Sequence, residues 1–285
     1  MMGTPNGAVS LDGKLSITDA EYERARKVLY DACGVALEGD RRSLVLGRLQ
    51  SVIRSLKLDN FTAYLDRVET DRSGRLMSQL VNQISTNYTY FGREWDHFEH
   101  FRRTGVPESV ERNKRSKVIR VWCAAASTGQ EPYTLAGLLA DTVGPDYANW
   151  DGGVLATDIN NEVLEAAHKG VFDPEEIKPL DADLRKRWFQ PTPDGKVRVV
   201  ERLRKDVLYR RFNLTKPAFS WKRPFDLIFC RNVMIYFDLP TKKALGVRLA
   251  NSLTRGGYLY IGIAESLEYD PKLLRPVQAG VFQRL

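Results

Sequence analysis

The stretch from Val118 to Tyr133 constrains the fold of this chain more than any other part of the sequence. It begins with the apolar, β-type run 118–123, passes through a turn of small residues and enters a helix at Glu131-Pro132. Small residues let the backbone come close to a ligand, and a proline suits the first turn of a helix because the missing N–H has no helical partner there. This order predicts the nucleotide-like ligand site of a doubly wound α/β protein.

From residue 118 onward, apolar β-type runs alternate with helical stretches, and this alternation predicts a parallel sheet covered by helices. The expected strands are 118–123, 153–157, 225–230, 258–262 and 280–285, and the expected helices are 133–141, 162–168 and 240–253. A charge-rich insertion interrupts the pattern. Within it, Asp194-Gly195 between two β-type runs is typical of a hairpin, so we expect a small antiparallel β-subdomain at about 170–212.

The N-terminal part has a different pattern. Residues 1–14 are small and polar, which predicts disorder. Thr18, with Glu21 three residues later, is typical of a capping box, and Gly34 ends that helix. Further helices are expected at 41–57, from Asn60 and at 74–84. The expected inward faces are Tyr22, Ala25, Leu29 and Ala32; Leu46, Leu49, Ile53 and Leu56; Phe61, Tyr64, Leu65 and Val68; and Leu76, Leu80 and Ile84.

Together these patterns divide the chain into domains. Four short helices predict a small all-α domain over residues 15–84, and residues 85–117 are expected to form a linker and a connecting helix. The α/β domain with its insert then covers residues 118–285. A chain of 285 residues is long enough for two such domains.

The composition excludes several classes of protein. Three scattered cysteines, Cys33, Cys123 and Cys230, are too few for a disulfide framework or a zinc site, so we expect no metal. The first fifteen residues lack the apolar core of a signal peptide, and no apolar run approaches the roughly 20 residues of a membrane span. We therefore expect a cytoplasmic protein that does not insert into a membrane. The net charge of +7 favours a polyanionic partner, which could be nucleic acid, membrane or an acidic protein.

The turn after Cys123 limits the kind of ligand. It lacks the lysine of a P-loop and the glycine spacing of a dinucleotide site, so it disfavours nucleoside triphosphates and dinucleotides. S-adenosylmethionine has no phosphate and fits such a turn, with Glu131 as the acceptor for its ammonium group. A purely structural turn remains an alternative, because the helix dipole by itself favours a glutamate at this position.

Two further segments add polar groups to the same edge of the predicted sheet. Asp158 ends the second strand, where it can accept hydrogen bonds from both hydroxyls of a ribose, although it could also cap the next helix. The apolar run 225–230 delivers Arg231 and Asn232, and Tyr236 follows four residues later. Here the alternative is a helix cap with a core tyrosine. Methyltransferases that act on amino groups commonly carry an Asn/Asp-Pro-Pro-aromatic run at this point, and this chain has none.

The polar and aromatic run 85–93, which ends in Arg93, could close over a ligand from the domain junction. Its planar guanidinium suits a carboxylate. Taken alone, such a run is more typical of a solvated linker.

In this order and spacing, these segments resemble the chemotaxis receptor methyltransferases of the CheR family. The matching runs are 86–94, 122–133, 157–159, 213–214 and 225–237, and the resemblance covers about residues 16–285. It implies a helical N-terminal domain and a class I methyltransferase domain with a β-subdomain insert. It also implies transfer of a methyl group from S-adenosylmethionine to glutamates on the cytoplasmic signalling domain of chemoreceptors, with S-adenosylhomocysteine as product. Tyr88, Gly92 and Gln130 depart from the commoner family residues.

The resemblance also implies roles for individual residues. Arg93 and Tyr236 match catalytic positions near the reacting centre. The cofactor-binding positions are Asn87, Thr89, Arg93, Glu131, Asp158, Asn213, Leu214, Arg231 and Asn232. Family members that dock on a tether at the receptor tail have a longer, glycine-rich hairpin loop than the one at 192–195. We therefore expect this chain to act without a tether.

The resemblance suggests a binding partner for the positively charged surface of this chain. Arg41 and Arg48 lie in one row beside an apolar stripe and could steer an acidic helical substrate, although a solvated basic face explains them equally well. We expect a monomer that binds no nucleic acid. Two alternatives are a regulatory module that senses S-adenosylmethionine without methyl transfer, and a nucleic-acid methyltransferase. The presence together of Arg93, Glu131, Asp158 and Tyr236 disfavours the first, and the missing aromatic run disfavours the second.

Overall fold

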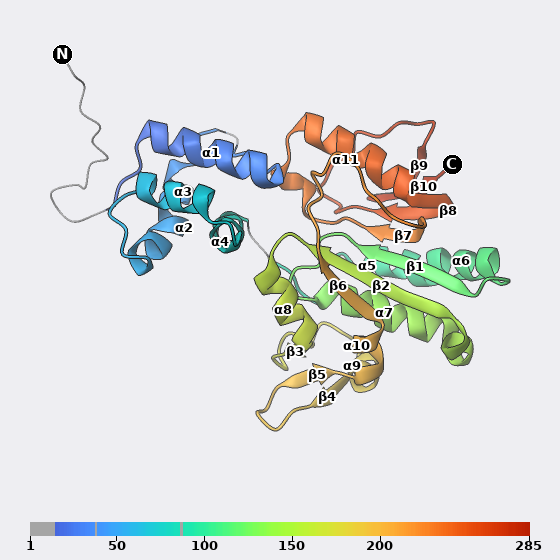
Figure 1. Ribbon diagram of the computed structural model, residues 1–285. Helices are drawn as coiled ribbons and strands as arrows, with labels where there is room; N and C mark the ends of the chain where they lie inside the picture. Colours follow the sequence, from blue (N-terminus) through green and yellow to red (C-terminus); the bar gives the residue numbers. More distant parts are fainter. Residues whose placement is uncertain (1–14, 38, 86–87) are drawn as a thin grey trace, which may run out of the picture. The chain divides into compact units, whose positions relative to one another are not determined.

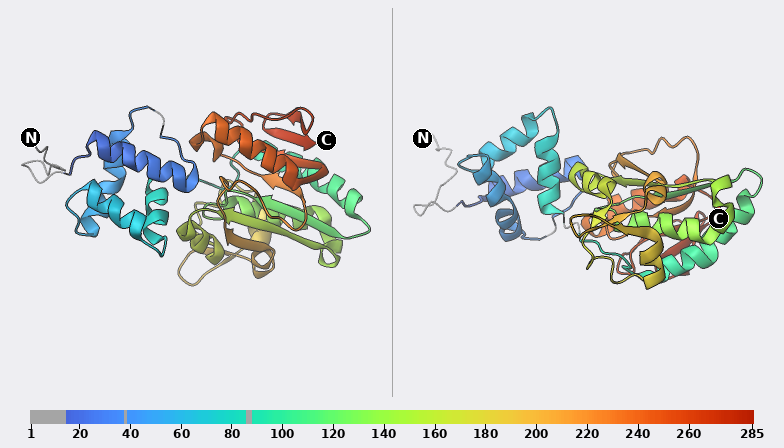
Figure 2. Two further views of the ribbon diagram at one scale, coloured as in Figure 1. Left: turned by 45° about the horizontal axis from the view of Figure 1, so that its top comes forward. Right: turned by 90° about the horizontal axis from the view of Figure 1, so that it is seen from below.

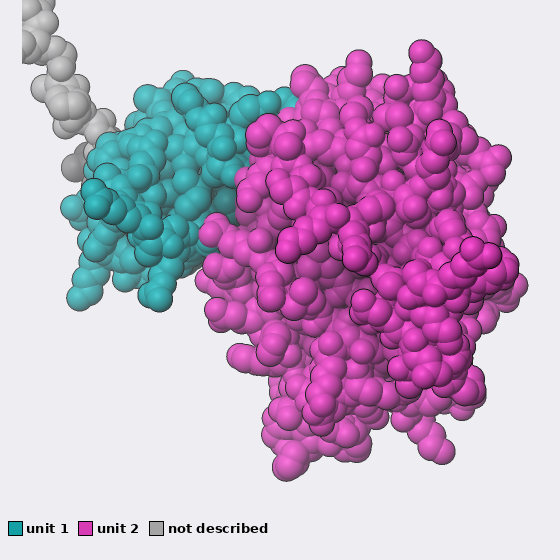
Figure 3. Space-filling model, turned by 45° about the vertical axis from the view of Figure 1, so that its right-hand side comes forward, with its two compact units in different colours: residues 1–87, 236–238 teal, residues 88–235, 239–285 magenta. Residues whose placement is uncertain are grey.

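The computed structural model describes residues 15–37, 39–85 and 88–285. The predicted disordered N-terminus and the predicted cofactor residue Asn87 lie outside these residues. The chain forms two compact units, which Figure 3 colours separately. The first unit contains the chain up to residue 87 together with residues 236–238, and the second contains residues 88–235 and 239–285.

The first unit is all-α among its described residues. Its helices are α1 (Asp19–Cys33), α2 (Arg42–Ser55), α3 (Phe61–Thr70) and α4 (Arg75–Ile84). The predicted capping box is confirmed: the Glu21 N–H donates to the Thr18 hydroxyl at 3.3 Å, and the Thr18 N–H donates to Glu21 Oε2 at 2.9 Å. The other oxygen of Glu21 accepts from the Thr62 N–H at 2.9 Å and therefore ties α1 to α3.

The inward face of α3 is as predicted, but three predicted faces are partly wrong. Val45 and Val52 are buried on α2, and Val81 is buried on α4. The predicted Ala32, Leu46, Leu56 and Leu76 are only half-buried. The prediction followed single rows at helical spacing, whereas each helix presents a wider stripe to its neighbours, in which the β-branched residues next to those rows take part.

Unit 1 also includes Tyr236–Asp238, a short segment that is distant from its helices in the sequence. Phe237 forms an isolated antiparallel bridge with Val35, and the Ala36 N–H donates to the Tyr236 carbonyl at 2.8 Å. The Tyr30 hydroxyl donates to Asp238 at 2.9 Å. The backbone of Tyr236 is therefore held by the segment that follows α1.

The second unit has a Rossmann-like architecture built on a seven-stranded sheet in the order β6-β2-β1-β7-β8-β10-β9. The strands are β1 (Val118–Cys123), β2 (Asp151–Asp158), β6 (Val207–Arg211), β7 (Phe225–Phe229), β8 (Leu253–Tyr260), β9 (Leu274–Gln278) and β10 (Val281–Arg284). The first five in the sheet order are parallel, but β10 is antiparallel to both β8 and β9. The predicted parallel sheet is confirmed for β2, β1, β7 and β8, and β10 and β9 make the whole sheet mixed.

Helices cover both faces of this sheet (Figures 1 and 2). They are α5 (Trp95–His100), α6 (Val106–Asn113), α7 (Gln130–Val143), α8 (Asn161–Lys169) and α11 (Leu239–Ser252), with a π-helical turn at Phe101–Gly105 between α5 and α6. On one face, Val121 and Cys123 join the main core with residues of α5, α6 and α7. On the other, Trp122 packs against Phe212, Phe219, Trp221 and Phe225.

The inserted β-subdomain is present but ends earlier than predicted. Its three-stranded antiparallel sheet comprises β3 (Val171–Phe172), β5 (Val197–Val199) and β4 (Phe189–Pro191), accompanied by α9 (Ala182–Trp188) and α10 (Glu201–Lys205). The Asp194-Gly195 hairpin is confirmed, with Gly195 at φ 78°. Residues 207–211, which we expected in the insert, instead pair with β2 as the edge strand of the main sheet. The exposed Arg210 and Arg211 are typical of an edge strand. They also interrupt the apolar pattern from which we predict strands.

No helix among the described residues is long and apolar enough to cross a membrane.

Candidate functional site

The predicted site residues of the second unit gather where three neighbouring parallel strands end. Cys123 of β1 pairs with Ala156 of β2 and with Phe229 of β7, so the segments that follow these strands leave the sheet side by side. The turn after β1 is hydrogen-bonded to both neighbours. The Ala124 N–H donates to the Phe229 carbonyl at 2.7 Å, and the Ala126 N–H donates to the Thr157 carbonyl at 2.9 Å.

The turn after β1 has an unusual backbone that fits a close approach to a ligand. Ser127 has φ 46° and Gly129 has φ 103°. A Cβ atom on Gly129 would lie 3.1 Å from the Ala167 side chain and 3.3 Å from the Tyr133 ring, so this position has little room for a larger residue. The conformation is fixed by Asp158, whose Oδ2 accepts from the Ser127 N–H at 2.9 Å.

Asp158 does not cap the helix that follows it. The N-cap of α8 is Asn160, whose side chain accepts from the Glu162 N–H at 2.9 Å. Asp158 Oδ1 accepts from the Asn160 N–H at 3.0 Å, and burial raises the pKa of the Asp158 carboxyl above its ordinary value. The carboxylate therefore lies at the strand end, where the ribose prediction needs it.

The centre of the site is a buried arginine between two carboxylates. Arg231 has 1% of its side chain exposed; its Nη1 lies 2.7 Å from Glu131 Oε2, and its Nη2 lies 3.2 Å from Glu94 Oε2. Its Nη2 also donates to the Arg93 carbonyl, and its guanidinium lies 5.1 Å from the centre of the Phe98 ring. Arg93 Nε also lies 3.9 Å from Glu94 Oε1, so this cluster pairs two carboxylates with two guanidinium groups.

Glu131 lies in the first turn of α7, as the sequence suggested, but it already has partners. Besides Arg231, the Cys123 thiol donates to Glu131 Oε1 at 3.2 Å. Burial raises the pKa of Glu131, although the positive charge of Arg231 opposes that effect. Burial likewise raises the pKa of the Cys123 thiol well above its ordinary value, so the thiol stays protonated and acts as a donor.

Glu94 is a site residue that the sequence reasoning missed. Its Oε1 accepts from Asn232 Nδ2 at 3.0 Å and its Oε2 accepts from the Ile263 N–H at 3.0 Å, so it joins the segment before α5 to the turn after β7. Burial raises its pKa, but the hydrogen bonds and Arg231 outweigh burial and the net shift is downward. The only signal in the sequence was its place directly after Arg93 in the run 86–94.

The remaining predicted residues of the second unit lie in two further segments. Arg93 Nη1 donates to the Tyr88 carbonyl at 2.7 Å, and Thr89 is half-buried in the same segment. Asn213 Oδ1 accepts from the Thr215 N–H at 2.9 Å, and the carbonyl of the buried Leu214 accepts from Arg248 at 3.0 Å.

Tyr236, Arg41 and Arg48, which were predicted as site residues, belong to the first unit. Tyr236 is held through its carbonyl by Ala36. Arg41 is exposed at the N-cap of α2, and Arg48 is exposed on α2, with its Nη1 3.4 Å from the Gln83 carbonyl.

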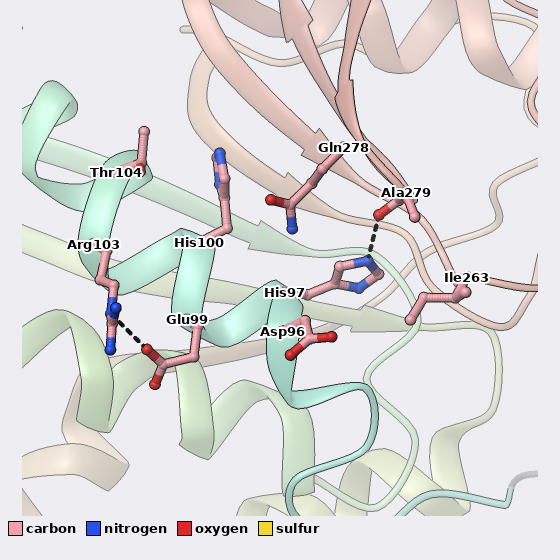
Figure 4. Close-up of a pocket in the computed structure, with 9 residues that line it drawn as sticks. All are labelled: Asp96, His97, Glu99, His100, Arg103, Thr104, Ile263, Gln278 and Ala279. Carbon is pink, nitrogen blue, oxygen red and sulfur yellow. Dashed lines mark hydrogen bonds and ion pairs between the residues drawn. The ribbon is translucent and has the colours of Figure 1, made fainter.

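The second unit also has a groove of about 510 Å³, whose lining residues are drawn in Figure 4. Its lining comes from α5, the π-helical turn, Ile263 and the β9–β10 turn, and contains none of the predicted cofactor residues. The buried His97 connects this groove with the cluster. Its Nε2 lies 3.1 Å from the Ala279 carbonyl oxygen, and its Nδ1 lies 3.5 Å from Glu94 Oε2. Burial lowers the pKa of His97, which favours the neutral ring.

The cluster at the strand ends fits a ligand that carries positive charge and a diol. Glu131 and Glu94 offer carboxylate oxygens to a cationic group, and Asp158 offers an acceptor for hydroxyls. S-adenosylmethionine has both features, with a sulfonium, an ammonium and a ribose.

Comparison with known proteins agrees with this geometry. The model of the S-adenosylmethionine-binding domain of CheR methyltransferases matches residues 87–282, and the model of their all-alpha domain matches residues 20–85. The chemotaxis protein methyltransferase of Escherichia coli is 37% identical over 263 residues, which cover 90% of this chain and 87% of the relative. That of Borreliella burgdorferi is 34% identical over 261 residues, which cover 91% and 92%. With matches that span both units, the chain belongs to the CheR family of chemotaxis methyltransferases.

Proposed function

We propose that this chain transfers the methyl group of S-adenosylmethionine to glutamate side chains on the signalling domains of chemoreceptors. The products are glutamate methyl esters and S-adenosylhomocysteine. The observation that carries this proposal is the buried cluster of Arg231, Glu94 and Glu131 beside Asp158, at the strand ends of a CheR-family chain.

The residues of the site would divide the work of binding the cofactor. Asp158 would accept from the ribose hydroxyls, and Glu131 would accept from the ammonium group while Arg231 and the Cys123 thiol hold its carboxylate in place. Glu94 would add a second negative charge near the sulfonium. Because the sulfonium is lost in the product, a carboxylate near it favours the cofactor over S-adenosylhomocysteine.

The chemistry requires little from the protein beyond position. The substrate glutamate is already ionised near pH 7, because the ordinary pKa of a glutamate lies well below 7, so no strong general base is needed. Bound S-adenosylmethionine supplies the activated methyl group. The chain's own residues must hold the carboxylate in line with the sulfur–methyl bond and exclude water. We assign the holding of the carboxylate to Arg93 and Tyr236.

The receptor would approach as an acidic helix. Arg41 and Arg48 are exposed and positively charged, which suits the steering of an acidic partner. The hairpin at 192–195 is short, so we propose that recruitment does not depend on a tether at the receptor tail.

A transfer assay with methyl-labelled cofactor tests this function. The expected result is label on glutamates of a receptor signalling fragment that mild base releases, as an ester requires. A fragment with glutamine at the acceptor positions is the matched control and should stay unlabelled. Base-stable label, or label on added RNA in place of the receptor, would contradict the proposal.

The tether prediction has its own measurement. Receptor fragments with and without the last residues of the tail should be methylated at rates within about twofold of each other. Tight binding of a receptor tail peptide in calorimetry would contradict tether independence without affecting the proposed chemistry.

A further inference from the structure

The carboxylate of Glu265 accepts hydrogen bonds from several backbone N–H groups of the turn that carries Arg231 and Asn232. Glu265 Oε2 accepts from the N–H groups of Asn232 and Gly262, both at 2.7 Å. Its Oε1 accepts from the N–H groups of Met234 at 2.7 Å and Ile235 at 3.3 Å. Four backbone donors from two separate segments therefore converge on a single side chain.

The turn after β7 needs such a partner because it lacks regular structure of its own. Asn232 has φ 58°, a left-handed conformation that non-glycine residues adopt at a cost. The short 3-10 turn Met234–Tyr236 offers little further pairing. Backbone N–H groups that point inward need acceptors, and Glu265 supplies them for three residues of this turn.

The packing around this carboxylate is tight. A Cβ atom on Gly262 would lie 2.6 Å from Asn232 Nδ2 and 2.9 Å from Glu265 Oε2, distances that a real side chain cannot adopt without displacing both. Asn232 is therefore fixed from two sides, through its N–H by Glu265 and through its side chain by Glu94.

We propose that Glu265 is a positioning residue for methyl transfer: it holds the turn 232–235 so that Arg231 and Asn232 meet the cofactor. This role rests on the proposed function, because it takes its meaning from the cofactor-binding roles of those two residues. Glu265 itself makes no contact with the substrate or the cofactor in this account.

The role requires a carboxylate of this length. An ionised glutamate is acceptor-only and offers both oxygens, whereas a glutamine would turn an NH2 donor toward two of the four N–H groups. An aspartate is one methylene shorter and cannot span both pairs of donors. We therefore expect neither conservative change to preserve the turn.

The test is the isosteric variant Glu265→Gln, with Glu268→Gln as the matched control. Glu268 is exposed and lies three residues further along the same loop. Four quantities are measured: the amide chemical shifts and hydrogen exchange of residues 232, 234, 235 and 262, the cofactor Kd by calorimetry, and kcat at saturating cofactor. For Glu265→Gln we expect upfield amide shifts, faster exchange, a Kd about tenfold higher and a kcat at least about tenfold lower. The control should match the wild type in all four.

Unchanged amides, or a Kd and kcat within twofold of the control, would overturn the proposal. The amide and Kd measurements need no methyl acceptor. If the wild-type protein fails to methylate receptor fragments, the proposed function therefore fails while the role of Glu265 in shaping the cofactor site is still decided.

A second variant applies if Glu265→Gln does not fold. Gly262→Ala keeps the carboxylate and presses a methyl group against Asn232 and Glu265. A cofactor Kd at least about tenfold higher would support the proposal, because the same turn is displaced by another route. Wild-type affinity in this variant would contradict it.

Discussion

Two segments of the second unit carry predicted site residues, and they are held in very different ways. The turn 231–235 is fixed by Glu265 and Glu94, and its Arg231 side chain is 1% exposed. In the segment 88–93, Tyr88 is 69% exposed and Tyr90 is 42% exposed, and the buried Phe91 anchors the segment between Phe172 and Phe189. The turn 231–235 is therefore held by hydrogen bonds within the protein. The segment 88–93, which we call the outer segment, is held mainly by Phe91 and exposes other side chains to solvent. We infer that the first binds the cofactor and that Arg93, at the end of the second, also acts on the substrate.

The largest expected effect comes from Arg231→Ala. This change leaves the largely buried carboxylate of Glu131 without a cation, whereas Glu94 keeps Arg93 Nε at 3.9 Å. Loss of the Arg231–Glu131 pair costs about 3 kcal/mol of folding stability. Cofactor affinity should fall about 100-fold, because the remaining carboxylates lose their fixed positions. Calorimetry and thermal unfolding check both numbers, with the exposed Arg255→Ala as the control. Wild-type affinity in Arg231→Ala would remove the turn from the cofactor site.

Changes at the proposed substrate-facing residues should act mainly on turnover. Arg93→Ala and Tyr236→Phe should each lower kcat about tenfold or more while the cofactor Kd stays within about threefold, because both position the reacting carboxylate. Steady-state kinetics with a receptor fragment, alongside calorimetry, separate the two quantities. If cofactor affinity falls as far as kcat, the division between the two segments is wrong.

The pH dependence of cofactor binding should report on the carboxylates at the strand ends. Burial raises the pKa of Glu131 and Asp158 above their ordinary values of 4.5 and 3.8. Both must be ionised to accept hydrogen bonds from the cofactor, so affinity should fall as the pH drops, beginning above pH 4.5. Calorimetry across this range measures the effect.

The stability of the ligand-free protein should not follow the same trend through these two groups. A carboxyl whose pKa is raised on folding takes up its proton more readily in the folded state, so acidification through that window favours the folded form at these positions. Thermal unfolding without cofactor provides this control. A cofactor affinity that is constant down to pH 4 would show that neither carboxylate contacts the cofactor.

The smallest expected effect is that of Tyr88→Ala. The side chain is mostly exposed and its ring makes one aromatic contact, with Tyr90 at 5.6 Å between centroids. Stability should change by less than about 0.5 kcal/mol, and cofactor Kd by less than about twofold. A large loss of cofactor affinity, measured by calorimetry, would mean that the exposed Tyr88 side chain itself contacts the cofactor.

The sequence predicts features that depend on local chemistry better than those that depend on distant partners. The Thr18–Glu21 capping box and the Asp194-Gly195 hairpin are set by residues close together in the chain, and both are confirmed. Strands β1 and β7 are apolar runs that were also found. The edge strands β6 and β9 could not be predicted, because arginines in both and Pro276 in β9 break the apolar pattern of a strand. Only their pairing with other strands of the sheet defines them.

The same distinction holds in the site. Glu131, Asp158 and Arg231 follow or begin regular elements, so their meeting at the sheet edge could be predicted. Glu94 and Glu265 could not, because their roles come from contacts with Asn232, which lies 138 and 33 residues away along the chain.

The central claim is that the acidic cluster at the strand ends binds S-adenosylmethionine through Glu131, and calorimetry on Glu131→Ala tests it most directly. Arg231 keeps Glu94 as a partner in this variant, so the protein should stay folded. Loss of a charge-assisted hydrogen bond to the ammonium group predicts a Kd about 10- to 100-fold higher than that of the wild type. Cofactor binding as tight as that of the wild type would contradict the account.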